Sequence, residues 1–194
     1  MKKNLLSNGN KKIGTDTLIF NMQSATDCEA KKLGLCTICR KKCYALKAEV
    51  QYPNVLPYRR RQEKYWDETS VQTKVDDLKS VLSRKRIPVK YFRFNEAGDF
   101  KHLSSMREFF EVAKTFPKIK FYTYTHRHDL IRILNKNKIP SNVNINVSNK
   151  KYKGMNEFRS VSKYSKGSIR CKGDCRICKL CATNKDITIE VLDH

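Results

Sequence analysis

The eight cysteines are the residues whose types and spacing most clearly indicate chemistry, and they fall into two groups. The first is spaced C-x7-C-x2-C-x3-C and the second C-x3-C-x2-C-x2-C, and no cysteine lies outside them. Scattered structural thiols would not sort in this way, and the reducing compartment that we expect argues against a disulfide framework. Each group is therefore predicted to bind a metal through thiolates. The predicted ligands are Cys28, Cys36, Cys39 and Cys43 (the first cysteine group) and Cys171, Cys175, Cys178 and Cys181 (the second cysteine group).

The spacing favours iron–sulfur clusters over zinc, more strongly for the first cysteine group than for the second. Structural zinc usually takes two short-spaced cysteine pairs separated by a longer loop, so that four thiolates close a tetrahedron around one ion. The segment "CKGDCRICKLC" instead crowds four thiols into eleven residues. Runs of C-x2-C-x2-C are typical of ferredoxin-type ligation, in which a larger cubane accepts closely spaced thiolates. We predict one or two [4Fe–4S] clusters, with zinc as the alternative metal and one metal of each kind still open.

Strand-like and helix-like hydrophobic patterns alternate along the chain. Period-two alternation predicts strands over 17–22, 89–94, 120–125, 143–148 and, more weakly, 187–192. Helical spacing of apolar residues predicts helices over 71–82, 103–113 and 130–134. This alternation predicts parallel β/α units with right-handed crossovers, and hence an α/β fold. We expect an incomplete parallel β/α barrel with an N-terminal cysteine loop in residues 1–150. A C-terminal cysteine-rich extension in residues 151–194 is expected to pack on the same domain.

Polar side chains alternate with apolar ones on the predicted strands. In "VNINVS", Asn144, Asn146 and Ser148 alternate with valine and isoleucine. If helices cover the apolar face, the polar face must look into the barrel or crevice. Because an ordinary barrel interior is filled mainly by branched apolar side chains, a polar interior indicates a lumen that binds a ligand. The alternative is an open sheet with one solvent-exposed face.

Candidate functional groups follow the predicted strands, where folds of this class place their sites. The first cysteine group follows the first strand, and "NEAGDF", with Asn95, Glu96 and Asp99, follows the second. The third strand is followed by "HRHD". A metallo-hydrolase is a further alternative, although no known zinc-hydrolase spacing is met. Its candidate ligands are His102, His126, His128, Asp99 and Asp129.

The charge balance favours a polyanionic partner. The chain has 41 basic and 19 acidic residues, a net charge of +22, which points first to nucleic acid. A solvated lysine-rich surface is the alternative. In "YRRRQEKYW", Arg59, Arg60 and Arg61 lie beside aromatic residues and form a candidate phosphate-binding and stacking patch. The same segment also fits an exposed helix whose aromatic residues pack inward.

No apolar run approaches the length needed to span a membrane, and the basic start breaks into "SNGNKK" before a signal-peptide core could form. We therefore expect no membrane partner and a cytoplasmic location, which is the host cytoplasm if the protein is phage-encoded. An electron donor is a further expected partner of an iron–sulfur protein. The oligomeric state is left open.

Four segments together resemble the phage family called Gene product 88 proteins. They are "CTICRKKCYALKAE", "LPYRRRQEKYW", "YFRFNEAGDF" and "CKGDCRICKLC", and the likeness covers nearly the whole chain. The Cys-Tyr-Ala step at residues 43–45 and the "NEAGDF" segment are its most specific features. The resemblance implies a viral or mobile-element origin.

The wider layout resembles radical S-adenosylmethionine proteins, which place a cysteine loop after the first strand of a partial β/α barrel. In those enzymes three thiolates hold a [4Fe–4S] cluster, S-adenosylmethionine chelates the fourth iron, and an acidic motif after the second strand binds the cofactor amine. The resemblance implies Cys36, Cys39 and Cys43 as cluster ligands, although their spacing inverts the usual C-x3-C-x2-C and leaves Cys28 as an alternative ligand. Glu96 would be the amine-binding acid.

The remaining cofactor contacts follow from position in the same resemblance. Asn95 and Asp99 flank the predicted amine-binding acid in "NEAGDF", and Asn144, Asn146 and Ser148 would face the ribose side. The second cysteine group would hold an auxiliary cluster. The leading hypothesis is thus an iron–sulfur protein that modifies a nucleotide, a nucleic acid or a protein. The alternative is a zinc-stabilised, basic nucleic-acid-binding protein without catalysis.

Overall fold

The structure is a computed structural model that describes residues 3–38 and 42–192. Its helices include two short 3-10 segments, Lys3–Leu5 and Lys136–Lys138. The α-helices are α1 (Glu29–Lys32), α2 (Tyr44–Gln51), α3 (Val55–Glu68), α4 (Val71–Ser83), α5 (Leu103–Lys114), α6 (His128–Ile133), α7 (Cys175–Cys178) and α8 (Leu180–Thr183). The strands are β1 (Ser7–Asn8), β2 (Thr17–Phe20), β3 (Tyr91–Phe94), β4 (Lys120–Thr125), β5 (Val143–Ser148), β6 (Asn156–Val161), β7 (Ile169–Arg170) and β8 (Thr188–Leu192).

The strands of the described residues form one eight-stranded sheet in the order β1-β2-β3-β4-β5-β6-β8-β7. Only the β1–β2 pair is antiparallel, and the other six pairings are parallel. From β2 to β6 the strands follow one another in chain order, so right-handed crossovers place their connecting helices on one face. The predicted α/β fold with a mostly parallel sheet is confirmed.

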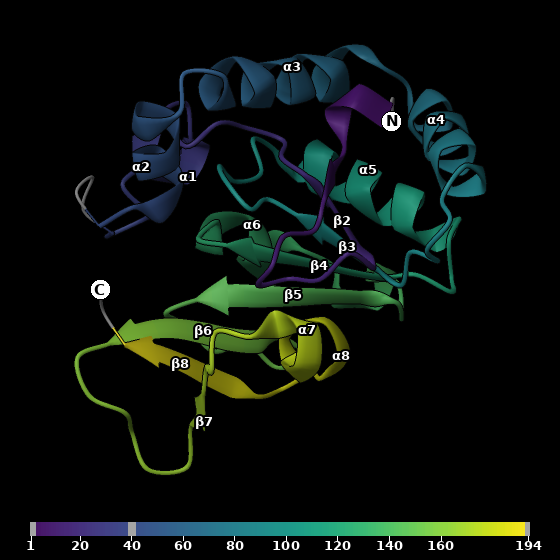
Figure 1. Ribbon diagram of the computed structural model, residues 1–194. Helices are drawn as coiled ribbons and strands as arrows, with labels where there is room; N and C mark the ends of the chain where they lie inside the picture. The colour runs from purple at the N-terminus through teal and green to yellow at the C-terminus, as the bar shows by residue number, and fades with distance from the viewer. Residues whose placement is uncertain (1–2, 39–41, 193–194) are drawn as a thin grey trace.

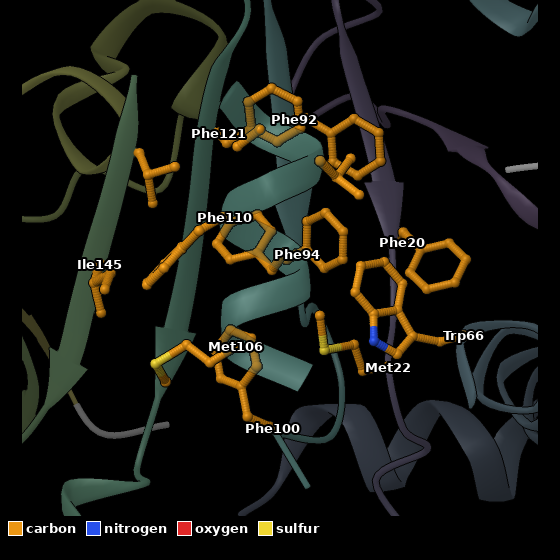
Figure 2. Close-up of a cluster of buried hydrophobic side chains, with 14 of the residues drawn as sticks. Phe20, Met22, Trp66, Phe92, Phe94, Phe100, Met106, Phe110, Phe121 and Ile145 are labelled. Carbon is orange, nitrogen blue, oxygen red and sulfur yellow. The ribbon is translucent and has the colours of Figure 1, made fainter. Parts of the chain in front are cut away.

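Helices α3, α4 and α5 cover one face of the sheet (Figure 1). The core on this face is rich in aromatic residues. Phe92 stacks on Phe94 and on Phe121, with ring centroids 5.0 and 5.2 Å apart. Phe109 of α5 inserts against Phe94 at 4.3 Å. Trp66 of α3 packs on Phe94 at 5.1 Å. Figure 2 shows the rings of Phe92, Phe94, Phe121 and Trp66 in one cluster. Burial of so much aromatic surface fixes the helices on this side of the sheet.

The opposite face of the sheet is polar. We call it the polar face and define it by alternate residues of three neighbouring strands: Tyr91, Arg93, Tyr122, Tyr124, Asn144 and Asn146. Helices α7 and α8 lie on this side, since α8 contacts β4 and β5 from there (Figure 1). The strand order explains the change of side: the chain passes from β7 back toward β6 to form β8, so a right-handed crossover runs over the other face.

The C-terminal residues continue the sheet as well as carrying cysteines. Strand β6 pairs with β5, and β8 pairs with β6, so residues 156–192 are built into the same sheet as the N-terminal half. The sequence pattern did not predict β6, because "NEFRSV" lacks alternating apolar residues. Polar contacts take their place: Arg159 Nε donates to Glu190 Oε1 at 2.8 Å, and Thr188 Oγ1 donates to Glu157 Oε2 at 3.2 Å.

Candidate metal centres

The second cysteine group lines one pocket on the polar face. Cys171 follows β7, and Cys181 lies in α8. Cys175 and Cys178 are the first and last residues of α7. Tyr122 and Tyr124 of β4 form the floor of this pocket. The Tyr124 hydroxyl donates a hydrogen bond to the Cys181 thiol, so the sheet contacts a candidate ligand directly.

Asparagines of the polar face hold α8 in place. Asn146 Nδ2 donates to the Cys181 carbonyl at 3.0 Å, and Asn144 Nδ2 donates to the Asn184 carbonyl at 2.7 Å. Asn156 Nδ2 in turn donates to Asn146 Oδ1 at 3.1 Å. Asn144 and Asn146 therefore do face the polar side, but their amides bind the chain itself. Their predicted contact with a cofactor ribose, like that of buried Ser148, stays a prediction.

Lys179, the residue between α7 and α8, connects the second cysteine group to the start of β2. Lys179 has a left-handed backbone with φ of 50°, which turns the chain between the two short helices. Its ammonium group lies 3.0 Å from Asp16 Oδ1 and 4.2 Å from the centre of the Tyr91 ring. The segment with the second cysteine group thus spans the polar face from β5 to the start of β2.

The thiols of Cys175 and Cys181 favour the protonated form in the absence of a cation. Burial, opposed by the Tyr124 hydrogen bond and reinforced by the neighbouring thiols, raises the pKa of Cys181 to about 12. Burial also raises the pKa of Cys175, while the nearby charge of Arg93 acts in the opposite direction. A metal that binds here must displace these protons, and its positive charge would remove the repulsion among thiolates.

Glu190 fixes the chain just before the second cysteine group. Its side chain is 0 % exposed and accepts from Ser168 Oγ at 2.5 Å and from the Ser165 amide at 2.7 Å. The Glu190 carbonyl accepts from the Cys171 amide at 2.7 Å. The hydrogen bond from Ser168, with those from Ser165 and Arg159, lowers the pKa of Glu190 to about 2 against the opposing effect of burial.

We predict that Glu190 contributes to acid sensitivity. Because its folded pKa of about 2 lies below the ordinary value of 4.5, its contribution to stability is present above pH 4.5 and is lost as the pH falls toward 2. When the pH is lowered from about 5 to about 3, the free energy of unfolding of Glu190→Gln, measured by urea titration, should fall less than that of the wild type. Exposed Glu68→Gln serves as the control. An equal loss in Glu190→Gln and wild type would contradict the prediction.

The first cysteine group lies at the carboxyl ends of β2 and β3. Cys28 precedes α1 and Cys43 precedes α2, so short helices begin directly at two of the thiols. Amides of Ala30 and Lys31 hydrogen-bond to the Cys28 thiol, and the amide of Ile38 to the Cys36 thiol. Such N–H···S bonds are what tune cysteine ligands in iron–sulfur proteins. Cys39 lies outside the described residues.

Charges also connect the thiols of this first group. Burial, with smaller contributions from Asp99 and Cys36, raises the pKa of Cys28 to about 12. Burial also raises the pKa of Cys36, on which Cys43 and Asp99 act in the same direction. Cys36 therefore lies within electrostatic reach of both Cys28 and Cys43. None of the described cysteines of either group forms a disulfide.

A buried ion pair clamps both ends of the first cysteine loop. Arg59 donates from NH1 to Glu49 Oε1 at 2.7 Å and to the Ala45 carbonyl at 2.9 Å. The same carboxylate accepts from the amides of Ala25 and Thr26 at 2.7 and 2.9 Å. Burial acts to raise the pKa of Glu49, but these hydrogen bonds outweigh it and the net pKa is lowered. One carboxylate thus joins the segment before Cys28 to the helix after Cys43.

The "NEAGDF" segment packs against this loop. Asn95 Oδ1 accepts from the Met22 amide at 3.1 Å, and Asn21 Oδ1 accepts from the Ala97 amide at 2.8 Å. Gly98 has φ of +69°, and a Cβ there would lie 2.5 Å from Gln23 Cβ, so only glycine allows the close approach. Asn95 therefore serves the backbone through its carbonyl oxygen.

The two acids of "NEAGDF" have different surroundings. Asp99 is fully engaged: Thr125 Oγ1, the His126 amide and the Phe100 amide donate to it at 2.6, 2.7 and 2.8 Å. Burial, only partly offset by these bonds, raises the pKa of Asp99 to about 6. Glu96 is half-buried, and within the described part of the chain no hydrogen bond or ion pair holds its carboxylate. Of the predicted cofactor contacts, Glu96 is the one with a carboxylate free to bind a ligand.

The two acids of the metallo-hydrolase alternative have structural partners, whereas the buried ring atoms His126 Nε2 and His128 Nδ1 have no hydrogen-bond partner among the described residues. Asp99 is engaged as described, and Asp129 forms an ion pair with Arg127 at 2.7 Å. His102 precedes α5, while His126 and His128 carry lowered pKa values because burial disfavours their charged forms. With both acids already engaged, the described residues assemble no hydrolytic centre from this set.

The predicted basic patch is only partly on the surface. Arg59 is 5 % exposed and its guanidinium is used by Glu49, so this arginine stabilises the packing of α2 on α3 instead of contacting a phosphate. Arg60 is exposed and pairs with Asp27 at 2.9 Å. The exposed Arg61 lies 5.9 Å from the centre of the Tyr58 ring. Buried aromatic residues of the same helix, Tyr65 and Trp66, face the core, in agreement with the alternative interpretation of this segment.

Sequence reasoning did not single out the residues that lie between the two cysteine groups. Tyr44, directly after Cys43, donates through its hydroxyl to the Glu96 carbonyl at 2.5 Å. Arg93 NH2 donates to the Tyr44 hydroxyl at 3.3 Å, and its guanidinium lies 5.0 Å from the centre of the Tyr124 ring. A continuous set of side chains therefore leads from Cys43 to the pocket at Cys181. The signal for it was the polar alternation in "YFRF" and "KFYTYT".

The metal itself stays a prediction. Among residues 3–38 and 42–192, no three histidine, cysteine, aspartate or glutamate side chains gather closely enough to hold a metal ion. The donor sets nevertheless fit thiolate-bound metal: all four thiols of the second group line one pocket, and those of the first group that are described interact electrostatically.

These features define an α/β protein whose mostly parallel sheet carries one cysteine group at its strand ends and a second across its polar face. The chain belongs to the Gene product 88 family, whose family model matches residues 4–184 and so spans both cysteine groups. This confirms the family resemblance seen in the sequence. Searches of curated proteins and of solved structures found no match.

In the described part of the chain, no helix is long and apolar enough to cross a bilayer.

Proposed function

We propose that this protein is an iron–sulfur protein with a radical S-adenosylmethionine-like architecture, acting on a nucleotide, a nucleic acid or a protein. The observation that carries the proposal is that the second cysteine group lines a pocket on the polar face, while the first follows the carboxyl end of β2 and is linked to Arg93 of the same face through Tyr44. Thiols placed for zinc-dependent folding alone would not need to converge on a shared polar surface.

The strand order supports the architectural part of this proposal. Strands β2 to β6 follow one another across the sheet, with helices α3 to α6 packed on the outer, aromatic side. An incomplete β/α barrel has this arrangement, and the polar face would then be its inner surface. The first cysteine group would lie at the mouth, because it follows the carboxyl end of β2, where such folds place their sites.

The two groups have different roles in the proposal. Four cysteines in the second group would close a [4Fe–4S] cluster completely, which suits a structural or electron-transfer centre. Three cysteines of the first group, chosen among Cys28, Cys36, Cys39 and Cys43, would leave one iron without a protein ligand. Such a cluster supplies electrons and an open coordination position, at which S-adenosylmethionine would be chelated.

Residues of the chain complete this site. The free carboxylate of Glu96 would bind the cofactor amine, since it is half-buried beside the cysteine loop and has no partner in the described chain. Tyr44 would fix the relation between the loop and β3, because its hydroxyl contacts both Glu96 and Arg93. Helices α7 and α8 cover the polar face and would restrict the access of water to it.

Iron and acid-labile sulfide analysis of anaerobically purified protein tests the proposal. We expect a brown protein with about four to eight iron atoms per chain and matching sulfide. After reduction, cleavage of S-adenosylmethionine to 5′-deoxyadenosine is expected, and Glu96→Gln should weaken cofactor binding without loss of iron. A colourless protein with stoichiometric zinc would overturn the iron–sulfur proposal, and a fully loaded protein that does not cleave the cofactor would overturn its radical part.

The alternative is a zinc-stabilised nucleic-acid-binding protein, favoured by the net charge of +22. Of the predicted patch, Arg60 and Arg61 are exposed and could contact phosphates, while Arg59 is buried. The salt dependence of DNA or RNA binding would test this partner, since each neutralised phosphate steepens the slope of log K against log salt by about 0.7 to 0.9.

A further inference from the structure

Arg93 is a partly buried cation for which the described residues provide no acidic partner. Six other partly or fully buried lysine and arginine side chains are each within 3.0 Å of a carboxylate oxygen. Those pairs are Arg59–Glu49, Lys74–Glu108, Lys101–Glu63, Arg127–Asp129, Arg159–Glu190 and Lys179–Asp16. Within the described residues, no carboxylate lies in ion-pair contact with Arg93.

The neighbours of Arg93 are aromatic hydroxyl-bearing residues. Tyr44 accepts one hydrogen bond from NH2 at 3.3 Å, and the ring of Tyr124 lies 5.0 Å from the guanidinium carbon. Tyr122 and Glu96 interact with the charge at longer range. The Nε atom is shielded from solvent and has no hydrogen-bond partner in the described chain. A cation on a sheltered polar face with unused donors is costly unless an anion binds there.

The position of Arg93 selects the kind of anion. It lies on the central strands of the polar face, between the first cysteine group, reached through Tyr44, and the second, whose Cys175 its charge influences. The guanidinium offers a planar fork of donors that matches a carboxylate or a phosphate, and the hydroxyl of Tyr44 adjoins it. Tyrosine rings beside the fork provide apolar walls for the rest of a small molecule.

We propose that Arg93, with Tyr44, binds the carboxylate or phosphate group of a small-molecule ligand on the polar face. The inference rests on an unpaired charge and its neighbours, and it holds whichever metal the cysteines bind. It would place the ligand between the two cysteine groups.

Thermal stabilisation by two simple anions tests this site in the full-length protein as purified. The probes are inorganic phosphate and malonate, each compared with sodium chloride at equal ionic strength. A ligand that binds only the folded state raises the midpoint of unfolding in a saturable way. We expect such a rise with at least one probe, and the probe that binds tighter identifies the group as phosphate or carboxylate.

Three variants separate the site from general charge effects. Arg93→Gln should abolish the saturable rise, and Arg93→Lys, which keeps the charge but not the fork, should weaken the apparent affinity roughly tenfold. Arg107→Gln removes the same charge from an exposed position on α5 and should bind like the wild type.

Several results would overturn the proposal. It fails if neither anion stabilises the wild type beyond chloride, or if Arg93→Gln binds as tightly as the wild type. It also fails if Arg93→Gln loses bound metal together with anion binding while Arg93→Lys retains both, because Arg93 would then serve the thiolate centre. Metal content is therefore measured for every variant. Failure of the iron–sulfur proposal alone would leave anion binding and its dependence on Arg93 intact.

Discussion

Replacing Cys181 with serine is expected to remove the iron and sulfide of the second cysteine group, about four of a total of about eight iron atoms. Cys181 lines the shared pocket, receives the hydrogen bond of Tyr124, and is anchored through its carbonyl by Asn146. Serine keeps the size of the side chain but is a poor ligand for iron, so the centre should not assemble. Iron, sulfide and visible absorption of anaerobically purified protein measure the effect.

Two controls make this result specific. Lys185→Ser introduces a serine at an exposed position of the same segment and should keep full iron content. Cys28→Ser changes a candidate ligand of the other group and should leave the second centre loaded. If Cys181→Ser retains all its iron and sulfide, then the second group does not bind a cluster through this cysteine.

The second large effect is expected from Arg59→Ala, which should lower the free energy of unfolding by about 3–5 kcal/mol. The side chains of Arg59 and Glu49 are 7 % and 1 % exposed, so removal of the arginine leaves a carboxylate charge buried without its cation. The lost stability should appear in urea unfolding as a lower midpoint with an unchanged slope. Because Glu49 joins both ends of the first cysteine loop, this variant should also retain less metal at that group.

The neighbouring arginine provides a matched control. Arg60 forms an ion pair of similar length with Asp27, but the two side chains are 54 % and 28 % exposed. Solvent screens such a pair, so Arg60→Ala should cost no more than about 1 kcal/mol. If both alanine variants lost the same free energy of unfolding, burial would add nothing to the contribution of the Arg59–Glu49 pair. The double variant Arg59→Met with Glu49→Leu should regain only part of the stability, because it leaves no buried charge but removes the acceptor of the Ala25 and Thr26 amides.

The arrangement of the polar face connects these predictions. One end carries the first cysteine group with the free carboxylate of Glu96, and α8, with the second cysteine group, covers its middle. Arg93 and its tyrosines lie between them. Any ligand bound at Arg93 would therefore be close to both candidate centres. Variants of Arg93 test anion binding at this site, and variants of the cysteines test its metal content.

Sequence alone determined the parts of this protein that depend on local pattern. Strands β2, β3, β4, β5 and β8 lie within or close to the predicted ranges, because period-two alternation reflects a strand with one apolar and one polar face. The spacing of the cysteines in the sequence also predicts that they form two groups. Family membership was visible in the motifs around Cys43 and "NEAGDF" and is confirmed by the family match.

Only the tertiary structure decided how side chains far apart in sequence are used. The Asn144 amide donates to a carbonyl 40 residues away at the end of α8, and the Asn146 amide donates to one 35 residues away within α8. Arg59 is buried against Glu49 instead of facing solvent. Strand β6 forms although its pattern is weak, since β5 and β8 provide its partners. The tertiary structure also decides that no carboxylate of the described residues forms an ion pair with Arg93. Pattern fixes which face a residue occupies, but its partners come from chain segments that only folding brings together.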